Sequence, residues 1–345
     1  MKVLMLSSGD RVPSARFRLH PFVQPLRERG HTVTILQSIP QKYEYWKWMG
    51  FRPSQKLKRT VRWWHSVRAR LGRYDVVIFD REVFDTPDTN AEQRFRKACP
   101  RMVLDVDDAV FLRYPGKYEK LAALADAVVA GNRYLDEYTR PHNGNITIIP
   151  TCVPMTAYPE IDRSRSNPRP VIGWMGTPPN LKYLNVAAPA LQKLANKHDF
   201  ELLLITPNVE HLDQAALAGV DIRHEIWDKH LEVDQLRQSD IGIMPLFAEQ
   251  EWDKYKCGLK LIQYMAVGLP GVASPVGVNS EIVEHGQSGF VATTEEDWFQ
   301  ILDELLTDPS RRTAVGIAAR KRAAALYSIE ANVSQLEAVL SGASD

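Results

Sequence analysis

Two series of short apolar runs, each alternating with stretches of helical periodicity, lie on either side of a proline-rich segment. The first series comprises the apolar runs at 2–7, 31–36, 75–79, 102–106, 126–130 and 145–149. The second series comprises those at 170–175, 200–206, 220–227, 240–246 and 270–275. Buried strands that alternate with helices form parallel sheets with helices on both faces. The pattern therefore predicts an α/β protein with two doubly wound domains and a cleft between them.

The proline-rich segment has no hydrophobic period and predicts the linker between the two domains. We expect a first domain over 1–155, a linker over 156–169 and a second domain over 170–327. A terminal helix is expected within 328–345, because 329–340 has a helical pattern.

Composition narrows the class of protein. Lys plus Arg number 43 and Asp plus Glu 42, and 44% of the residues are hydrophobic, which excludes a disordered chain and a dedicated polyanion binder. Three cysteines do not make a disulfide framework and favour a reducing, cytoplasmic compartment. The apolar run at 2–7 is too short for a signal peptide, and no apolar stretch reaches the length of a membrane span.

Ligands of doubly wound sheets bind beyond the carboxyl ends of the strands, so the loops there are the candidate sites. The loop at 7–19 has a single glycine, Gly9, which counts against a dinucleotide site. Arg16 and Arg18 near the next helix start either contact a phosphate or carboxylate or form a solvated basic turn. Arg81 and Glu82, after the strand at 75–79, either line the cleft or form an internal ion pair.

The motif DVDDAVF at 105–111 places three carboxylates at one strand end. Their mutual repulsion would raise some of their pKa values unless a cation or a sugar hydroxyl offsets it. Three functional interpretations stay open: a metal site, the nucleophile loop of a haloacid-dehalogenase-type phosphatase, and a sugar site without metal. A structural alternative is helix capping by Asp107 or Asp108.

In the second domain, the segment GWMGTPPNLKYL at 173–184 predicts a strand that ends at Gly176 and a helix capped by Asn180. Lys182 then lies in the first turn of that helix, where the macrodipole disfavours a cation. Its placement suggests an anionic ligand nearby, and a solvated lysine is the alternative.

The most specific stretch is 252–283. Lys256, Lys260 and Gln263 are spaced to share one face near a helix N-terminus, where free N–H groups and two lysines form a diphosphate cradle. Gly258 would let a ligand approach the backbone, and Gln263 could bond a ribose hydroxyl. The alternative is an ordinary amphipathic helix. A second loop–helix element follows, with Gly277, Ser280 and Glu281.

Several of these segments resemble the nucleotide-sugar glycosyltransferases of the GT-B fold, close to glycosyltransferase family 4. LRERGHTVTIL is similar to the first helix-to-strand turn of that family, and IIPTCVPMTAY to the segment before its linker. GLKLIQYMAVGLPGVASPVGVNSEIVEHGQSGFV is similar to its long second-domain signature. Together with DVDDAVF and GWMGTPPNLKYL, the set resembles a bacterial subgroup.

The resemblance implies two Rossmann-like domains facing a cleft, with a terminal helix that crosses back to the first domain. It implies a nucleotide diphosphate-sugar donor, a hydroxyl acceptor, retention of anomeric configuration, and neither metal nor cofactor. Polysaccharide, glycolipid or other glycoconjugate synthesis is the expected role, with no nucleic-acid partner. A sugar-nucleotide epimerase or hydrolase and a catalytically weak partner subunit are the alternatives.

The residues that match the implied site fall into three groups. The candidate catalytic residues are Asp107, Lys182 and Lys260. The candidate donor-binding residues are Gly176, Thr177, Lys256, Cys257, Gly258, Leu259, Gln263 and Glu281. The candidate residues of the acceptor side are Gly9, Arg16, Arg81, Glu82 and Asp108.

The chain also departs from the family pattern. The family commonly has two glutamates flanking seven residues, and these positions fall on Tyr255 and Gln263. A histidine often found in the first domain is replaced by Asp107.

The segment 42–73 holds ten Lys or Arg, one acidic residue and four tryptophans. Its apolar residues recur at helical spacing and predict an amphipathic helix with a basic opposite face, at Leu57, Val61, Trp64, Val67 and Leu71. Tryptophan with Lys and Arg suits an anionic membrane surface, which would place a peripheral enzyme with a lipid-linked acceptor on the inner face of the membrane. The alternative is a helix packed on the first domain with its basic face in solvent.

Overall fold

The structure is a computed structural model that describes residues 1–160, 167 and 169–343. The chain divides into two compact units. The first contains Met1–Cys152, Tyr255–Cys257 and Ile329–Asp345, and the second contains Val153–Lys254 and Gly258–Ser328. The units therefore change at 152/153, three residues before the predicted end of the first domain. Residues 161–166 and 168 of the predicted linker lie outside the described residues.

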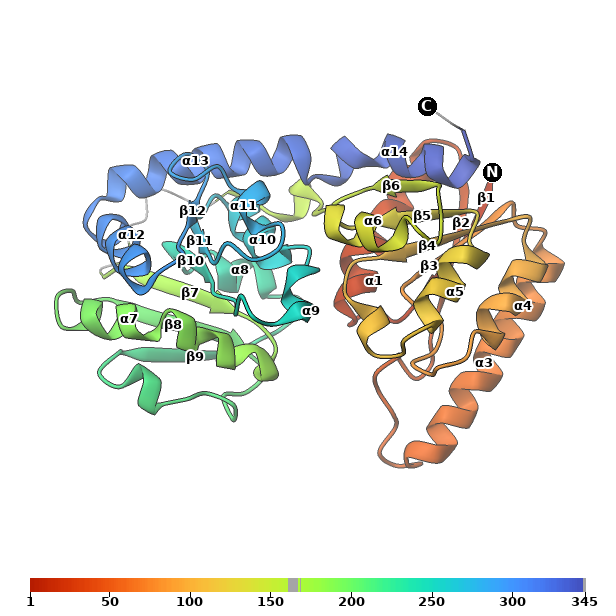
Figure 1. Ribbon diagram of the computed structural model, residues 1–345, viewed down its shortest axis with the longest axis horizontal. Helices are drawn as coiled ribbons and strands as arrows, with labels where there is room; N and C mark the ends of the chain where they lie inside the picture. The colour runs from red at the N-terminus through yellow and green to blue at the C-terminus, as the bar shows by residue number, and fades with distance from the viewer. Residues whose placement is uncertain (161–166, 168, 344–345) are drawn as a thin grey trace. The chain divides into compact units, whose positions relative to one another are not determined.

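The first unit is built on a six-stranded sheet with the strand order β2-β1-β3-β4-β5-β6 (Figure 1). The strands are β1 (Lys2–Ser7), β2 (Thr32–Gln37), β3 (Val76–Asp80), β4 (Arg101–Val106), β5 (Ala127–Ala130) and β6 (Ile146–Ile148). Neighbouring strands pair in parallel. The order places β2 and β3 on opposite sides of β1, so the winding reverses at β1. The carboxyl ends of β1, β3 and β4 therefore meet at one edge beside this switch point.

Helices surround this sheet. They are α1 (Pro13–Arg18), α2 (Val23–Glu28), α3 (Phe51–Gly72), α4 (Asn90–Ala98), α5 (Lys117–Leu124), α6 (Arg133–Thr139) and α14 (Ile329–Ser341), with short 3₁₀ turns η1 (His20–Phe22) and η2 (Val110–Leu112). The last helix, α14, packs against α2, β3, β4 and β5. Its residues Val333, Leu336 and Leu340 are buried in the same apolar cluster as Met5 and Ile78 of the sheet.

The segment between β1 and β2 forms α1, η1 and α2 rather than one continuous helix. Pro21 and Pro25 interrupt the segment because proline lacks the N–H that a continuous helix needs. Ser14 does not cap the helix. Its buried hydroxyl donates a hydrogen bond to Asp80, 2.8 Å away.

Helix α3 packs on the first unit with a mostly polar face, not with the apolar face that the periodicity predicted. Its buried residues are Ser54, Lys58, Arg62, Ser66 and Ala69. Of the residues expected on the packed face, Trp64 and Leu71 are exposed, by 59% and 77%, and Leu57, Val61 and Val67 are only partly buried. The expectation of a packed apolar face with a solvated basic face is therefore wrong.

The second unit has a six-stranded sheet in the order β12-β11-β10-β7-β8-β9, again with parallel pairs. Its strands are β7 (Val171–Met175), β8 (Glu201–Thr206), β9 (Ile222–Ile226), β10 (Ile241–Met244), β11 (Gly271–Ala273) and β12 (Phe290–Val291). The chain winds from β7 through β8 to β9, and the sheet then continues from β10 on the other side of β7. The switch point of this unit lies between β7 and β10.

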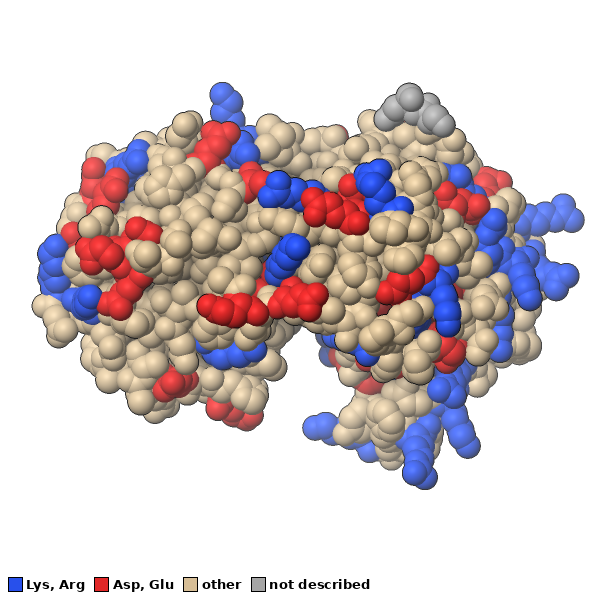
Figure 2. Space-filling model, viewed as in Figure 1, with Lys and Arg blue, Asp and Glu red and all other residues tan. Residues whose placement is uncertain are grey.

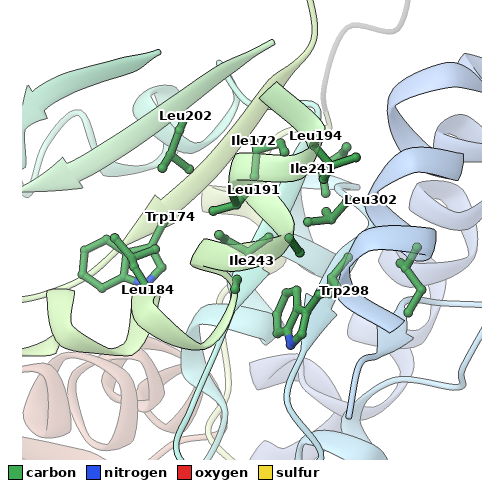
Figure 3. Packing of buried hydrophobic residues seen from close by; sticks show 14 of the residues in the cluster. Ile172, Trp174, Leu184, Leu191, Leu194, Leu202, Ile241, Ile243, Trp298 and Leu302 are labelled. Atoms are coloured by element: carbon green, nitrogen blue, oxygen red, sulfur yellow. The ribbon is translucent and has the colours of Figure 1, made fainter. Parts of the chain in front are cut away.

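The second unit also has helices on its sheet. They are α7 (Ala188–Ala195), α8 (Glu232–Leu236), α9 (Glu251–Lys254), α10 (Leu259–Val267), α11 (Asn279–Ile282), α12 (Glu295–Thr307) and α13 (Pro309–Leu326), with 3₁₀ turns η3 (Met155–Ala157), η4 (Pro178–Val186) and η5 (Ala215–Leu217). Figure 3 shows the core between the sheet and α7 and α12, where Trp174 and Trp298 are each 1% exposed.

The structure also differs from the prediction of a single helix capped by Asn180 after the first strand of the second domain. The segment forms η4 followed by α7, and Thr177 rather than Asn180 precedes the first turn. Pro189 lies inside the predicted helix and lacks the N–H that a continuous helix needs there, so α7 starts at Ala188 with Pro189 in its first turn. Among the described residues, no helix is both long and apolar enough to span a membrane.

Candidate functional site

The first unit gathers charged side chains at the switch point, directly after β3 and β4. Arg81 follows β3, and its Nε donates to Asp107 Oδ1 at 2.5 Å. Its Nη2 lies 3.4 Å from Asp108 Oδ2. Arg81 has a backbone φ of +62°, which a residue with a side chain rarely adopts. Such strain persists where surrounding structure imposes it, often at functional sites.

The two adjacent carboxyls have pKa values shifted in opposite directions. Burial alone would raise the pKa of Asp107, but the charge of Arg81 and its hydrogen bond outweigh burial and hold that pKa below its usual value. Burial raises the pKa of Asp108 to about 6, because Arg81 offsets it less and the charge of Asp107 adds to the increase. Asp107 is therefore ionised at neutral pH, whereas Asp108 gains its proton near pH 6.

The third carboxyl of the motif has a structural partner. Asp105 is buried and accepts from Arg18, whose Nη2 lies 2.7 Å from Asp105 Oδ2. Arg18 also donates to the carbonyl of Ile149 at 2.7 Å. The anion that Arg18 was expected to contact is thus a carboxylate of its own unit. Arg18 and Arg81 offset the repulsion among the three carboxylates only in part, because burial and the charge of Asp107 still raise the pKa values of Asp105 and Asp108 to about 6.

Other predicted residues of the acceptor side are also engaged within the first unit. Glu82 is buried and accepts from Lys42 Nζ at 2.7 Å, so the internal pair involves Lys42 and not Arg81. Gly9 has a φ of +142°, and a Cβ there would lie 2.4 Å from Gln41 Oε1. Arg16 lies over the ring of Phe17, 4.9 Å from its centre.

The segment Tyr255–Cys257 belongs to the first unit. The thiol of Cys257 donates a hydrogen bond to the carbonyl of Asp107 at 3.2 Å. The charge of Lys256 lowers the pKa of Asp108 and so offsets part of the increase caused by burial. The spacing predicted that Lys256 shares a helix face with Lys260 and Gln263. This prediction is wrong, because Lys256 lies before the helix. The helix starts only at Leu259, because Gly258 before it has a left-handed φ of +63°.

In the second unit, the candidate donor site lies at the carboxyl end of β7. Lys260 is in the first turn of α10, and its Nζ lies 5.6 Å from the centre of the Trp174 ring. Gly176 follows β7, and a Cβ on it would meet the Trp174 ring at 2.5 Å and Lys260 Cε at 3.2 Å. A glycine is needed for this close approach. The first-turn N–H groups of α10 and the Lys260 ammonium together favour an anion.

Lys182 and Thr177 lie on the same unit, in and before η4. Thr177 and Lys182 are exposed. The ammonium of Lys182 donates to Gln250 Oε1 at 3.3 Å. Lys182 is not in the first turn of an α-helix, so the macrodipole argument for it no longer applies.

Gln263 lies deeper than the sequence suggested and is 1% exposed. Its Nε2 donates to Tyr158 Oη at 3.0 Å and to Glu232 Oε1 at 2.9 Å, which uses both amide protons. Glu232 in turn accepts from Trp227 Nε1 at 2.8 Å. A ribose hydroxyl would have to donate to the remaining amide oxygen. Tyr158 and Glu232 were not identified from sequence, because their role depends on contacts with residues far along the chain.

The remaining donor-side residues lie around α10 and α11. Leu259 is the first residue of α10 and partly exposed, and Glu281 on α11 is exposed. Gly277 has a φ of +57°, and a Cβ there would lie 2.6 Å from the carbonyl oxygen of Lys254. Within residues 1–160, 167 and 169–343, no cluster of three or more His, Cys, Asp or Glu could hold a metal ion.

Residues 169–308 match the family described as glycosyl transferases group 1. A segment of 89 residues is 34% identical to D-inositol 3-phosphate glycosyltransferase of Pseudarthrobacter chlorophenolicus. That match covers 25% of this chain and only 20% of the relative, so the chain spans about a fifth of that protein's length.

Two solved structures share the fold over essentially the whole chain. Sucrose-phosphate synthase from Thermosynechococcus elongatus superposes with a TM-score of 0.73 at 16% identity and covers 100% of both chains. HepE of Anabaena, in complex with UDP-glucose, has a TM-score of 0.66 at 15% identity and covers 99% of this chain and 100% of its own. The α/β, GT-B-like fold expected from the sequence is therefore confirmed.

Proposed function

We propose that this chain, whose residues 169–308 match the family described as glycosyl transferases group 1, transfers a sugar from a nucleotide diphosphate-sugar to a hydroxyl acceptor. The observation that carries the proposal is the position of Lys260 in the first turn of α10, beside Gly176 at the carboxyl end of β7. A diphosphate is the ligand that fits a lysine, a helix N-terminus and a glycine in one place. HepE, which shares the fold, was crystallised with UDP-glucose.

The proposed chemistry is stabilisation of the leaving group. When the bond between sugar and phosphate breaks, negative charge develops on the nucleotide diphosphate. A cation and N–H dipoles already in position stabilise that charge without reorganisation, which lowers the barrier. We assign this role to Lys260 and the α10 N-terminus, with Lys182 as the second cation. The reaction then proceeds with retention and without a metal.

We assign the removal of the proton from the acceptor hydroxyl to the carboxylates of the first unit. The pKa of Asp108, raised to about 6 by burial, makes this group a better proton acceptor near neutral pH than the strongly ionised Asp107. Asp107, which accepts a hydrogen bond from Arg81, would hold the loop that carries Asp108 in place. This assignment makes Asp108 the proposed base, rather than the candidate catalytic residue Asp107.

The proposed acceptor is a lipid-linked precursor of a cell-envelope polysaccharide or glycolipid, and the proposed location is the cytoplasmic side of the membrane. Three buried free cysteines fit a reducing compartment.

The test is the release of nucleotide diphosphate from UDP-, GDP- and ADP-linked sugars in EDTA, with and without an alcohol acceptor. Release that requires an acceptor supports transfer. Equal release without acceptor would instead indicate a hydrolase, conversion of the sugar without release an epimerase, and no turnover of any donor a partner subunit. Lys260→Ala should lower the rate about a hundredfold or more. Lys321→Ala, at an exposed lysine on α13, is the matched control and should not change it.

A further inference from the structure

Helix α3 exposes apolar side chains and buries polar ones. Its buried stripe, Ser54, Lys58, Arg62 and Ser66, repeats every four residues, which is one side of a helix. The opposite stripe carries Trp63, Trp64 and Leu71, exposed by 45%, 59% and 77%. A helix of a water-soluble domain normally packs its apolar stripe inward. The reversed orientation calls for a physical cause and for a use of the exposed face.

The cause lies in backbone carbonyls that need donors. Arg62 donates to the carbonyls of Leu36 and Ser7 at 2.9 and 2.6 Å, near the carboxyl ends of β2 and β1. Lys58 donates to the carbonyls of Lys42 and Glu44 at 2.6 and 3.1 Å. Burial lowers the pKa of Lys58 to about 8 and that of Arg62 to about 10. These contacts fix the inner face, so the tryptophans must face outward.

The outer face is both apolar and basic. Helix α3 contains no acidic residue, and Arg52, Lys56, Arg59, Arg68 and Arg70 are exposed on it. None of these five forms an ion pair with a described carboxylate, in contrast to the buried Lys42 before the helix. Figure 2 shows Lys and Arg gathered along the edge of the first unit where α3 lies in Figure 1.

The outer face is also hollowed toward the end of the helix. Trp64, Val67, Leu71 and Tyr74 line an open hollow of about 350 Å³, together with Arg68 and Gly72. The hollow thus combines aromatic and aliphatic walls with a guanidinium. Residues before the helix extend the apolar surface, since Trp48 and Phe51 are exposed by 78% and 60%.

We propose that the outer face of α3 docks on the surface of an anionic lipid bilayer. Tryptophan lies at the boundary between headgroups and acyl chains, and Lys and Arg on the same face attract anionic headgroups. A protein partner of ordinary composition would leave five unpaired cations facing an apolar interface, whereas anionic headgroups match both features of the face. The inference extends the proposed function, because a docked enzyme is placed next to a lipid-linked acceptor.

The test is co-sedimentation of the full chain with vesicles of phosphatidylcholine containing about 30% phosphatidylglycerol, since anionic lipid is the proposed ligand. The chain should bind these vesicles at low salt. Its binding to vesicles of pure phosphatidylcholine should be weaker by a factor of about ten or more. The double variant Trp63→Ser/Trp64→Ser should lower the partition coefficient about tenfold or more. The double variant Arg59→Glu/Arg68→Glu should also lower the partition coefficient about tenfold or more. Its binding to anionic vesicles should depend less on the salt concentration than that of the wild type.

Two exposed residues of the second unit provide matched controls. Ile226→Ser removes an apolar side chain that is 71% exposed, and Lys321→Glu reverses an exposed charge. Neither should change vesicle binding. All substituted positions are on the surface, and an unchanged melting temperature would show that each variant folds.

Absence of binding to anionic vesicles, or equal binding by both α3 variants and the wild type, would overturn the proposal. A dimer in lipid-free buffer that Trp63→Ser/Trp64→Ser converts to a monomer, without change in vesicle binding, would assign the face to a second copy instead. Turnover of donor with a water-soluble acceptor is measured in parallel. Intact turnover without vesicle binding refutes only the docking, and vesicle binding without turnover refutes only the proposed function.

Discussion

Asp107 and Asp108 are adjacent in sequence but differ in charge behaviour. The arginine that pairs closely with Asp107 holds its pKa low, and burial raises the pKa of Asp108 to about 6. The sequence predicted that some carboxyls of this motif would have raised pKa values. It could not show which, because Arg81 and Arg18 approach the motif from other strands and helices.

Asp108→Asn should make the protein more stable and less active at pH 7. The folded-state pKa lies above the value of 3.8 for an ordinary aspartate, so the ionised form destabilises the native state at neutral pH. Removing this charge should add about 3 kcal/mol to the free energy of unfolding at pH 7. The gain should shrink as the pH falls from about 6 toward 4, because wild-type Asp108 then binds a proton in the fold.

Urea unfolding at pH 7 and pH 4 measures this difference. The rate of transfer by wild-type enzyme should fall below about pH 6, and the variant should lose about a hundredfold in rate at pH 7. A variant less stable than wild type at pH 7, or one with unchanged activity, would refute the assignment of Asp108.

Arg18→Met should destabilise the first unit strongly. The change leaves the Asp105 carboxylate buried without its partner, which typically costs about 3–5 kcal/mol. The cost should be smaller at pH 5 than at pH 8, because a neutral Asp105 needs no counter-charge. Thermal melting across this pH range measures it. The double variant Arg18→Met/Asp105→Leu should recover most of the loss, and a double variant as unstable as the single one would contradict this account.

At the level of single elements, the start of α10 depends on Gly258. The sequence indicated a glycine at a ligand site, and the structure adds two further constraints. The φ of +63° favours glycine, and a Cβ there would lie 2.1 Å from Ile282 Cδ1. Gly258→Ala should therefore cost about 1–2 kcal/mol or more and weaken nucleotide binding, because the lysine-bearing first turn would shift. Isothermal titration with nucleotide diphosphates measures the affinity. An unchanged affinity would show that the first turn of α10 is not part of the donor site.

Helix α14 contributes to the core of the first unit although it lies at the end of the chain. Leu336 is 2% exposed and packs in the cluster that includes sheet residues Met5 and Ile78. Leu336→Ala should destabilise the chain by about 2–5 kcal/mol through the cavity it leaves. Gln335→Ala, at an exposed neighbour, is the control. Chemical denaturation monitors both, and equal stability of the two variants would show that α14 does not support the core.

The elements also show where sequence reasoning fails. Apolar periodicity located α3 but assigned the wrong face to the interior, because hydrogen bonds from Lys58 and Arg62 to distant carbonyls decide the packing. Pro189 at the start of α7 and Pro21 between α1 and α2 produced shorter elements than the pattern suggested. Strand positions were easier to predict, since buried parallel strands form continuous apolar runs.

For the molecule as a whole, the alternation of strands and helices was sufficient to predict two parallel α/β sheets. The membership of Tyr255–Cys257 in the first unit was not predictable, because it depends on contacts with Asn132 and Asp107 more than 100 residues away. The near-zero net charge also conceals the basic surface of α3. Average composition therefore excluded a dedicated polyanion binder, but it said nothing about a local basic surface.

The central claim is that the second unit binds a nucleotide diphosphate-sugar through Lys260 and the α10 N-terminus without a metal. The most direct measurement is a thermal-shift panel of UDP, GDP, ADP and their sugars in EDTA, because binding to the folded state raises the melting temperature. We predict a shift with one nucleotide series that is lost in Lys260→Ala and kept in Lys321→Ala. A shift that requires a divalent metal, or no shift with any nucleotide, would contradict the claim.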